Sequence, residues 1–329
     1  MRALLCKDYG GIDALVLEEA APPALKPGEV RLKVQACGVN FPDTLIVEGK
    51  YQFKPEPPFS PGGEVAGIVT ELGEGVEEAG GVAVGDPVIA VTIWGGFAEE
   101  IAVPAAQLLP YPAAMDPAVA AGFAMTYGTA MHALTQRARL DEGETLLVLG
   151  AAGGVGLAAV EIGKRLGARV IAAASTPEKL EVARRAGADD GIDYSARPLK
   201  DAVKDLTGGR GADVVFDPVG GDLTEQALRA TGWGGRHLIV GFAAGAIPKI
   251  PANLTLLKGC SVVGVFWGDF VKREPAANRA NFDTLFRWVA EGALKPLVSE
   301  RFALADAGQA LHRLADRKAV GKLVVDLSR

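Results

Sequence analysis

Apolar and polar residues alternate along the first hundred or so positions in a way that is typical of strands with one buried face. In residues 29–36 every second side chain is apolar, starting with Val30. Similar patterns run through residues 64–71, 88–91 and 96–103, with glycine-rich or proline-rich turns close by. Closely spaced strands without helices between them predict an antiparallel barrel or sandwich-like unit.

The pattern changes near Asp116-Pro117, which is a helix start signal before the alanine-rich residues 118–134. From residue 145 onward, strand and helix patterns alternate strictly up to a last strand at residues 261–266. Earlier strands of this run are predicted at residues 145–149, 169–174, 212–217 and 236–241, and one of the helices at residues 199–206. The strand at residues 145–149 is almost continuously apolar, as expected when helices cover both faces of a parallel sheet. This alternation predicts a Rossmann domain with a doubly wound parallel sheet.

The last sixty residues predict a helix at 278–291, a strand at 297–302, a helix at 305–314 and a strand at 322–327. These elements do not extend the parallel sheet in a simple way, so we assign them to the first domain. The chain is therefore expected to be an α/β protein. Residues 1–115 and 268–329 form a β-rich catalytic domain, and residues 116–267 form the Rossmann domain. Two domains also agree with a length of 329 residues.

Composition excludes several classes of protein. Hydrophobic residues make up 49% of the chain and charged residues 22%, which is ordinary for a globular enzyme and excludes a disordered chain. The net charge of -6 disfavours a nucleic-acid surface. The longest uncharged stretch, residues 117–136, contains several polar side chains and makes a poor membrane span. The N-terminus does not resemble a secretory signal, and the three cysteines are far apart, so a reducing cytoplasm is expected.

A glycine-rich loop, residues 150–156, lies between a predicted buried strand and a predicted helix. Glycines let the backbone approach a pyrophosphate, whose charge the free N–H groups at the helix start can hold. The loop therefore predicts a dinucleotide site, the alternative being a merely tight turn. The next strand ends without the acid that usually binds the adenosine ribose of NAD. Ser175 and Lys179 instead suit a 2′-phosphate and favour NADP(H), although they could also be a helix cap and a solvated lysine.

Three motifs in this order resemble the medium-chain dehydrogenase/reductases: residues 38–43 (GVNFPD), residues 61–67 (PGGEVAG) and the glycine loop. Within that family the chain is most similar to the zinc-free quinone oxidoreductase (zeta-crystallin-like) branch. The resemblance extends over essentially the whole chain, to residues 320–325. It implies that the β-rich catalytic domain is GroES-like and that a second chain pairs with the first through the edge strand 261–266 to form a homodimer.

The resemblance also implies that no metal is bound. Zinc-dependent relatives have a cysteine at the position of Asn40, a histidine at that of Gly63 and a cysteine or related ligand near Ala121. None of these residues supplies the thiolate or imidazole that zinc prefers. The structural zinc of those relatives needs four cysteines after the position of Trp94, and residues 95–110 contain none.

By resemblance, Asn40, Tyr51 and Thr126 would lie near the nicotinamide and act on the substrate, with Tyr51 as the proton donor. Tyr51 could equally be a packing residue. The residues that would bind NADP(H) are Asn40, Thr126, Gly153, Gly154, Val155, Ser175, Lys179, Tyr194, Val240, Gly241, Phe242, Val265, Phe266 and Trp267.

The expected reaction is hydride transfer from NADPH to a quinone or related enone, whose oxygen is polarised by hydrogen bonds instead of by zinc. Six aromatic residues suit a flat, apolar carbonyl or quinone substrate, but they could also fill the core: Phe41, Tyr51, Phe53, Trp94, Phe242 and Trp267. Two alternatives stay open. The chain could reduce α,β-unsaturated carbonyls or acyl-CoA thioesters, or it could be a non-catalytic NADPH-binding module.

Overall fold

The computed structural model describes residues 1–79 and 81–328, apart from the side chains of residues 78 and 79. The chain forms two compact units. Met1–Met125 and Leu297–Arg329 make up one, which we call the terminal unit, and Thr126–Pro296 make up the other, which we call the central unit. No helix in the described residues is long and apolar enough to cross a membrane.

These boundaries differ from residues 116 and 267, which the sequence pattern indicates. The helix α3 (Pro117–Ala120) packs against strands of the terminal unit. At the other boundary, α10 (Trp267–Arg273) and α11 (Pro275–Ala290) belong to the central unit. They do not extend its sheet but pack on helices: Phe282 of α11 lies against Gly128 of α4 (Ala124–His132). The contacts thus group residues 268–296 with the central unit, whereas the sequence pattern assigns them to the terminal domain because they are not part of the sheet.

The central unit contains a six-stranded sheet in the order β10-β9-β8-β11-β12-β13, in which every neighbouring pair is parallel. Its strands are β8 (Thr145–Leu149), β9 (Arg169–Ala174), β10 (Asp190–Asp193), β11 (Ala212–Asp217), β12 (Thr231–Ile239) and β13 (Ser261–Gly264). The remaining helices of this unit are α5 (Gly154–Arg165), α6 (Pro177–Arg185), α7 (Leu199–Leu206), α8 (Asp222–Ala230) and α9 (Ala252–Lys258).

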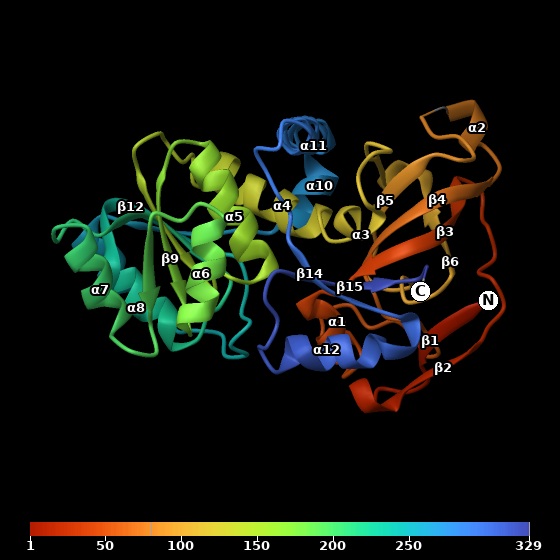
Figure 1. Cartoon of the computed structure of the whole chain (residues 1–329), viewed down its shortest axis with the longest axis horizontal. Helices are drawn as coiled ribbons and strands as arrows, with labels where there is room; N and C mark the ends of the chain where they lie inside the picture. Colours follow the sequence, from red (N-terminus) through yellow and green to blue (C-terminus); the bar gives the residue numbers. More distant parts are fainter. Residues whose placement is uncertain (80, 329) are drawn as a thin grey trace. The chain divides into compact units, whose positions relative to one another are not determined.

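Helices cover both faces of this sheet, with α5 and α6 on one side and α7 and α8 on the other (Figure 1). All five residues of β8 are buried, which explains their apolar character. The doubly wound Rossmann fold is thus confirmed. The strand β13 lies at one edge of the sheet, as expected, but ends at Gly264 instead of residue 266.

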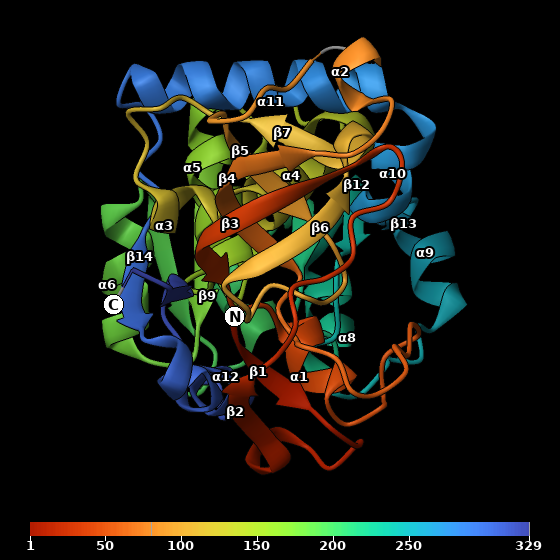
Figure 2. The same ribbon diagram turned by 90° about the vertical axis from the view of Figure 1, so that its right-hand side faces the viewer.

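The terminal unit contains a mixed sheet in the order β14-β15-β3-β4-β5-β7, with β6 paired to β3 (Figure 2). Its strands are β3 (Glu29–Gly38), β4 (Glu64–Leu72), β5 (Pro87–Val91), β6 (Glu100–Pro104), β7 (Leu108–Pro110), β14 (Val298–Phe302) and β15 (Lys322–Asp326). A separate antiparallel pair is formed by β1 (Arg2–Cys6) and β2 (Leu15–Glu19). The helices are α1 (Phe41–Ile46), α2 (Val76–Ala79), α3 and α12 (Ala307–Ala315). The C-terminal strand β15 pairs with β3 and so belongs to this unit, as the sequence pattern predicts.

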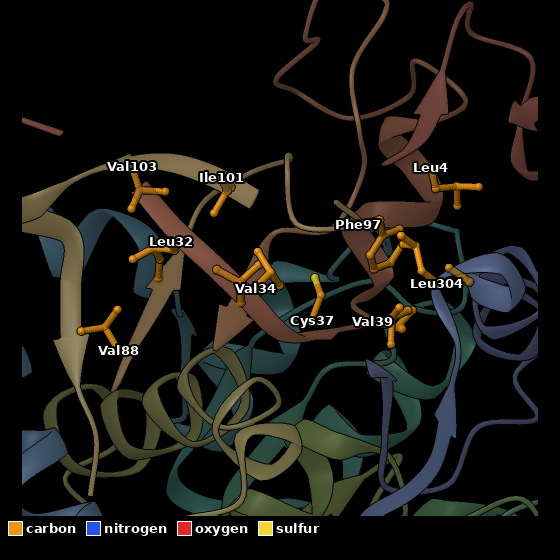
Figure 3. Close-up of a cluster of buried hydrophobic side chains, with 14 of the residues drawn as sticks. Leu4, Leu32, Val34, Cys37, Val39, Val88, Phe97, Ile101, Val103 and Leu304 are labelled. Carbon is orange, nitrogen blue, oxygen red and sulfur yellow. The ribbon is translucent and has the colours of Figure 1, made fainter. Parts of the chain in front are cut away.

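Side chains from one face of β3 form the centre of the terminal unit's core. Val30, Leu32 and Val34 are buried at every second position, which is the alternation seen in the sequence. Figure 3 shows the Cys37 sulfur within the same apolar cluster. A Cβ atom on Gly96 would lie 2.7 Å from that sulfur, so glycine is needed there for close packing. Cys37 is therefore a core residue, and burial raises the pKa of its thiol well above the usual range.

Candidate active site

A group of buried polar side chains joins three elements of the terminal unit. Lys322, the first residue of β15, donates from Nζ to Oδ1 of Asn40 (2.6 Å) and to Oε2 of Glu64 (3.0 Å). Asn40 Nδ2 donates to the same Glu64 oxygen (3.0 Å). Glu64 is fully buried, and the Lys322 side chain is only 8% exposed. We call these three residues the Asn40 triad.

Local sequence features bring the triad together. Asn40 precedes α1 as its N-cap residue, and its backbone N–H donates to Oδ2 of Asp43 in the first turn (2.7 Å). Two glycines leave room for the triad. A Cβ atom on Gly38 would lie 2.1 Å from the carbonyl oxygen of Ala121, and one on Gly122 would lie 2.5 Å from Cγ of Lys322.

Asp43 is a second buried acid beside this cluster. Burial raises its pKa to about 7, although the hydrogen bond from the Asn40 N–H and the charge of Lys322 act in the opposite direction. The negative charge of Glu64 contributes to the increase. Asp43 therefore changes its protonation state close to neutral pH.

Tyr51 is half-buried beside an apolar cluster that includes Phe59 and Ile46, and its ring is tilted against that of Phe53 (centroids 6.1 Å apart). Its hydroxyl has no hydrogen-bond partner among the residues described. Burial and the nearby Asp43 charge raise the pKa of Tyr51, so the hydroxyl keeps its proton at neutral pH. The packing role and a proton-donor role are both compatible with this position.

The residues near Asn40 do not suit a zinc ion. The oxygen of Asn40 accepts a hydrogen bond from an ammonium group, whose positive charge would repel a second cation. Gly63 has no side chain, and Ala121 presents only a methyl group. Across residues 1–79 and 81–328, no group of three or more His, Cys, Asp or Glu side chains is arranged to hold a metal ion.

In the central unit, the glycine loop connects β8 to α5. Gly153 is the N-cap of α5, and no side chain caps the first turn of this helix. A Cβ atom on Gly156 would lie 2.3 Å from the carbonyl oxygen of Gly150, so only glycine permits this close approach of helix and loop. Gly153, Gly154 and Val155 are half-buried. Their backbone forms a helix N-terminus that can accept an anionic phosphate group.

The loop after β9 has the side chains that the sequence indicates for a phosphate. Lys179 Nζ donates to Oγ of Ser175 (3.4 Å), and both residues are half-buried. Thr176, not Ser175, caps α6 by accepting from the Lys179 N–H (3.3 Å), so the Ser175 hydroxyl is not used as a helix cap. Tyr194 follows β10, the neighbouring strand, and is also half-buried.

The other expected cofactor residues also follow strands of the same sheet. Residues 240–242 come after β12 and are half-buried, while Val265 and Phe266 come after β13. The carboxyl ends of parallel strands all lie at the same end of a sheet, so the fold brings these residues to the end that carries the glycine loop. Thr126 is buried in α4.

Trp267 differs from these residues because its side chain is part of the core. It is 7% exposed, and its indole N–H donates to Oδ1 of Asn278 (3.1 Å). A Cβ atom on Gly128 would lie 2.8 Å from the ring. The indole therefore packs α10 against α4 and α11.

Asp217, at the carboxyl end of β11, is a polar residue whose importance the sequence did not indicate. One carboxylate oxygen accepts the backbone N–H groups of Val219 and Gly220 (both 2.9 Å), and the other lies 2.6 Å from the Thr224 hydroxyl and 3.1 Å from Nε2 of His237. Burial would raise the pKa of Asp217, but these hydrogen bonds outweigh it and hold the pKa below the ordinary value. Asp217 thus fixes the turn after β11 at the carboxyl end of the sheet, where the expected cofactor residues lie.

Sequence reasoning also missed Lys322, Glu64 and Asp43 as members of a site, although all three lie in or near quoted motifs. The available signal was a charge at the start of an otherwise apolar strand. Lys322 precedes Leu323, and Glu64 precedes Val65, in strands that are buried. A charged residue at a fully buried strand position has to be paired.

Comparison with known proteins identifies the family. Residues 26–113 match the model of the alcohol dehydrogenase GroES-like domain, and residues 154–291 match that of zinc-binding dehydrogenases. The quinone oxidoreductase-like protein 2 homolog of Nematostella vectensis is 41% identical over 99% of this chain and 88% of its own length. The chain belongs to the quinone oxidoreductase branch of the medium-chain dehydrogenase/reductase family.

Solved structures agree with this assignment. The quinone oxidoreductase of Thermus thermophilus is 35% identical, with a TM-score of 0.85, and the alignment covers 99% of this chain and 100% of that one. The Escherichia coli quinone oxidoreductase, solved in complex with NADPH, is 28% identical, with a TM-score of 0.91 and the same coverage. This medium-chain dehydrogenase/reductase is therefore an oxidoreductase with a GroES-like domain and a Rossmann domain, as the resemblance implied.

Proposed function

We propose that the protein is an NADPH-dependent oxidoreductase that reduces a quinone or a related enone without a metal ion. The observation that supports NADPH most directly is the Ser175–Lys179 pair after β9, where an acid would indicate NAD. The quinone oxidoreductases of E. coli and T. thermophilus were both solved in complex with NADPH, which is in line with this choice. We propose a quinone as the acceptor because the relatives that the chain matches are named as quinone oxidoreductases or quinone oxidoreductase-like proteins.

The glycine loop fits a dinucleotide because it leads directly into the N-terminus of α5, where no side chain caps the backbone N–H groups. In the proposed complex the backbone of Gly153, Gly154 and Val155 holds the pyrophosphate. Ser175, Lys179 and Tyr194 bind the adenosine 2′-phosphate. Val240, Gly241, Phe242, Val265 and Phe266, with Asn40 and Thr126, contact the nicotinamide half. NADPH supplies the hydride when it is bound.

The protein's own contribution to the chemistry is orientation and proton delivery. Tyr51 is our candidate proton donor because its hydroxyl is protonated at neutral pH and has no partner among the described residues. The Asn40 triad places a buried ion pair, Lys322 and Glu64, at the position where zinc-dependent relatives have their first ligand. We propose that the enzyme works without zinc on the basis of this donor set, and that it acts in the cytoplasm because its three thiols are all free.

Cofactor choice is tested by Lys179→Ala. Loss of a charge-assisted contact to a 2′-phosphate costs roughly 1.5–3 kcal/mol, or about one to two decades in affinity. The contact is remote from the reacting atoms, so the KM for NADPH should rise while kcat and the KM for NADH change little. Lys204→Ala is the matched control, since Lys204 is an exposed lysine near the end of α7. Equal, small effects of Lys179→Ala on both cofactors would show that Lys179 is only a surface residue.

The edge of the central sheet supports a homodimer. Beside the edge strand β13 and in the neighbouring segments, three large apolar side chains are 70–82% exposed: Trp233, Leu256 and Leu257. Exposed strand edges and apolar patches of this kind are usually covered by a partner. We propose that a second copy of the chain covers them, and sedimentation at micromolar concentration should show a dimer. A monomer would contradict this proposal.

A further inference from the structure

The carboxamide of Asn40 has no hydrogen left to donate to a ligand. Its Nδ2 group donates to the carbonyl oxygen of Gly38 (3.2 Å) and to Oε2 of Glu64 (3.0 Å). Its Oδ1 atom accepts from Nζ of Lys322 (2.6 Å). The N–H of Asp43, in the first turn of α1, donates to the Asn40 backbone carbonyl (3.0 Å).

The orientation of this amide follows from the chemistry of its neighbours. A lysine ammonium can only donate, and an ionised carboxylate and a backbone carbonyl can only accept. Rotating the amide by half a turn would place its N–H group against the ammonium and its oxygen against two acceptors. The oxygen must therefore face Lys322, and an amide oxygen has a second lone pair with which it can accept from a ligand.

The two charges that impose this orientation are expensive to bury. Glu64 is fully buried and also accepts the backbone N–H of Met125 (2.8 Å), while the stem of Lys322 passes Gly122, where a Cβ atom would lie only 2.5 Å away. A buried ion pair of this kind is often no more stable than a neutral replacement. Stability alone therefore does not account for the pair, and the residue that both charges contact is Asn40.

We infer that Lys322 and Glu64 are positioning residues that hold Asn40 so that it offers a ligand only its oxygen. The ligand group that meets Asn40 must then be a donor, an N–H or an O–H. The carboxamide and the ribose hydroxyls of a nicotinamide nucleoside carry such donors, whereas a quinone carries only acceptors. Asn40 therefore serves the cofactor and does not polarise the acceptor. This inference rests on the proposed NADPH-dependent function.

The test compares the wild type with Lys322→Met, Glu64→Gln and the double variant. Each single variant leaves one buried group without its partner and should lower the unfolding midpoint. The double variant is neutral and should regain most of the midpoint. It no longer fixes the amide as the wild type does, because the glutamine would keep its oxygen on the Met125 N–H and turn its N–H group toward Asn40, while the methionine donates nothing to Asn40 Oδ1. Lys318→Met is the matched control, since Lys318 is an exposed lysine paired with Asp316 on the surface.

NADPH binding is measured by fluorescence titration without an acceptor, and the KM for a quinone is then measured at saturating NADPH. The double variant should bind NADPH about tenfold more weakly, which is the loss of one hydrogen bond, with the KM for the quinone unchanged within about twofold. Wild-type affinity for NADPH in the double variant, or a change in the KM for the quinone instead, would overturn the inference alone. A wild type that binds no NADPH would overturn the proposed function, and the inference with it.

Discussion

Asp43 makes the stability of the protein depend on pH in the neutral range. Burial raises the pKa of its carboxyl from 3.8 to about 7, so the folded state holds this proton more tightly than the unfolded chain does. The resulting stabilisation is fully present below the unfolded pKa and is lost as the pH rises through the folded pKa. The free energy of unfolding should therefore fall between about pH 4 and pH 7 on account of this one group.

The size of the effect follows from the difference between the two pKa values. Each unit is equivalent to about 1.4 kcal/mol, so the full contribution is about 4 kcal/mol. Of this, about 3 kcal/mol should be lost between roughly pH 5 and pH 8. Asp43→Asn keeps the size of the side chain and an oxygen that can accept the Asn40 N–H, but it does not ionise. The altered hydrogen bonds of this variant can lower its free energy of unfolding, but by the same amount at every pH.

The assay is urea unfolding of the wild type and Asp43→Asn at several values between pH 5 and pH 8. The variant should gain about 3 kcal/mol relative to the wild type across this range. Asp283→Asn, at an exposed position of α11, is the control and should follow the wild type at every pH. Parallel curves for the wild type and Asp43→Asn would refute the reasoning, since they would mean that Asp43 binds its proton equally in both states.

Two further predictions concern the central unit. Gly156→Ala should destabilise the protein by roughly 1–3 kcal/mol and abolish NADPH binding, because its Cβ atom would lie 2.3 Å from the Gly150 carbonyl oxygen. Gly153→Ala, whose Cβ atom would lie 3.4 Å from that oxygen, should keep its unfolding midpoint, and equal midpoints for both variants would contradict this. Asp217→Asn should lower the free energy of unfolding, measured in urea, by about 2 kcal/mol. The asparagine points an N–H group at one of the groups that donate a hydrogen bond to the carboxylate in the wild type. An unchanged midpoint would show that the turn after β11 does not depend on this acid.

The buried strands of the central sheet could be predicted almost residue for residue. The pattern identifies β8, β9, β11 and the helix α7 at their observed bounds, because helices cover both faces of the sheet and only apolar residues fit the strands. The start of β12 was missed by five residues, since its first residues, Thr231 to Gly235, have the glycines of a turn. The pattern also does not show where α11 packs, which depends on contacts with other helices.

The candidate site could be predicted only where a local motif carries the chemistry. The glycine loop and the Ser175–Lys179 pair each lie within a few residues of chain, so sequence spacing reveals them. The Asn40 triad joins residues 282 positions apart, and nothing in the local pattern says that Lys322 contacts Asn40. The buried pair of Lys322 and Glu64 is therefore the part of the site that only a structure could reveal. Because this pair orients the Asn40 amide, we now interpret Asn40 as a hydrogen-bond acceptor and not as a donor.

The central claim is that this oxidoreductase uses NADPH to reduce a quinone without a metal. The most direct measurement is the oxidation of NADPH and NADH, in parallel, by purified and chelator-treated protein with a panel of quinones, enones and acyl-CoA thioesters. We predict quinone-dependent turnover with a kcat/KM for NADPH at least about tenfold above that for NADH, unchanged by the chelator. A preference for NADH, loss of activity on chelation, or NADPH binding without turnover on any acceptor would contradict the account.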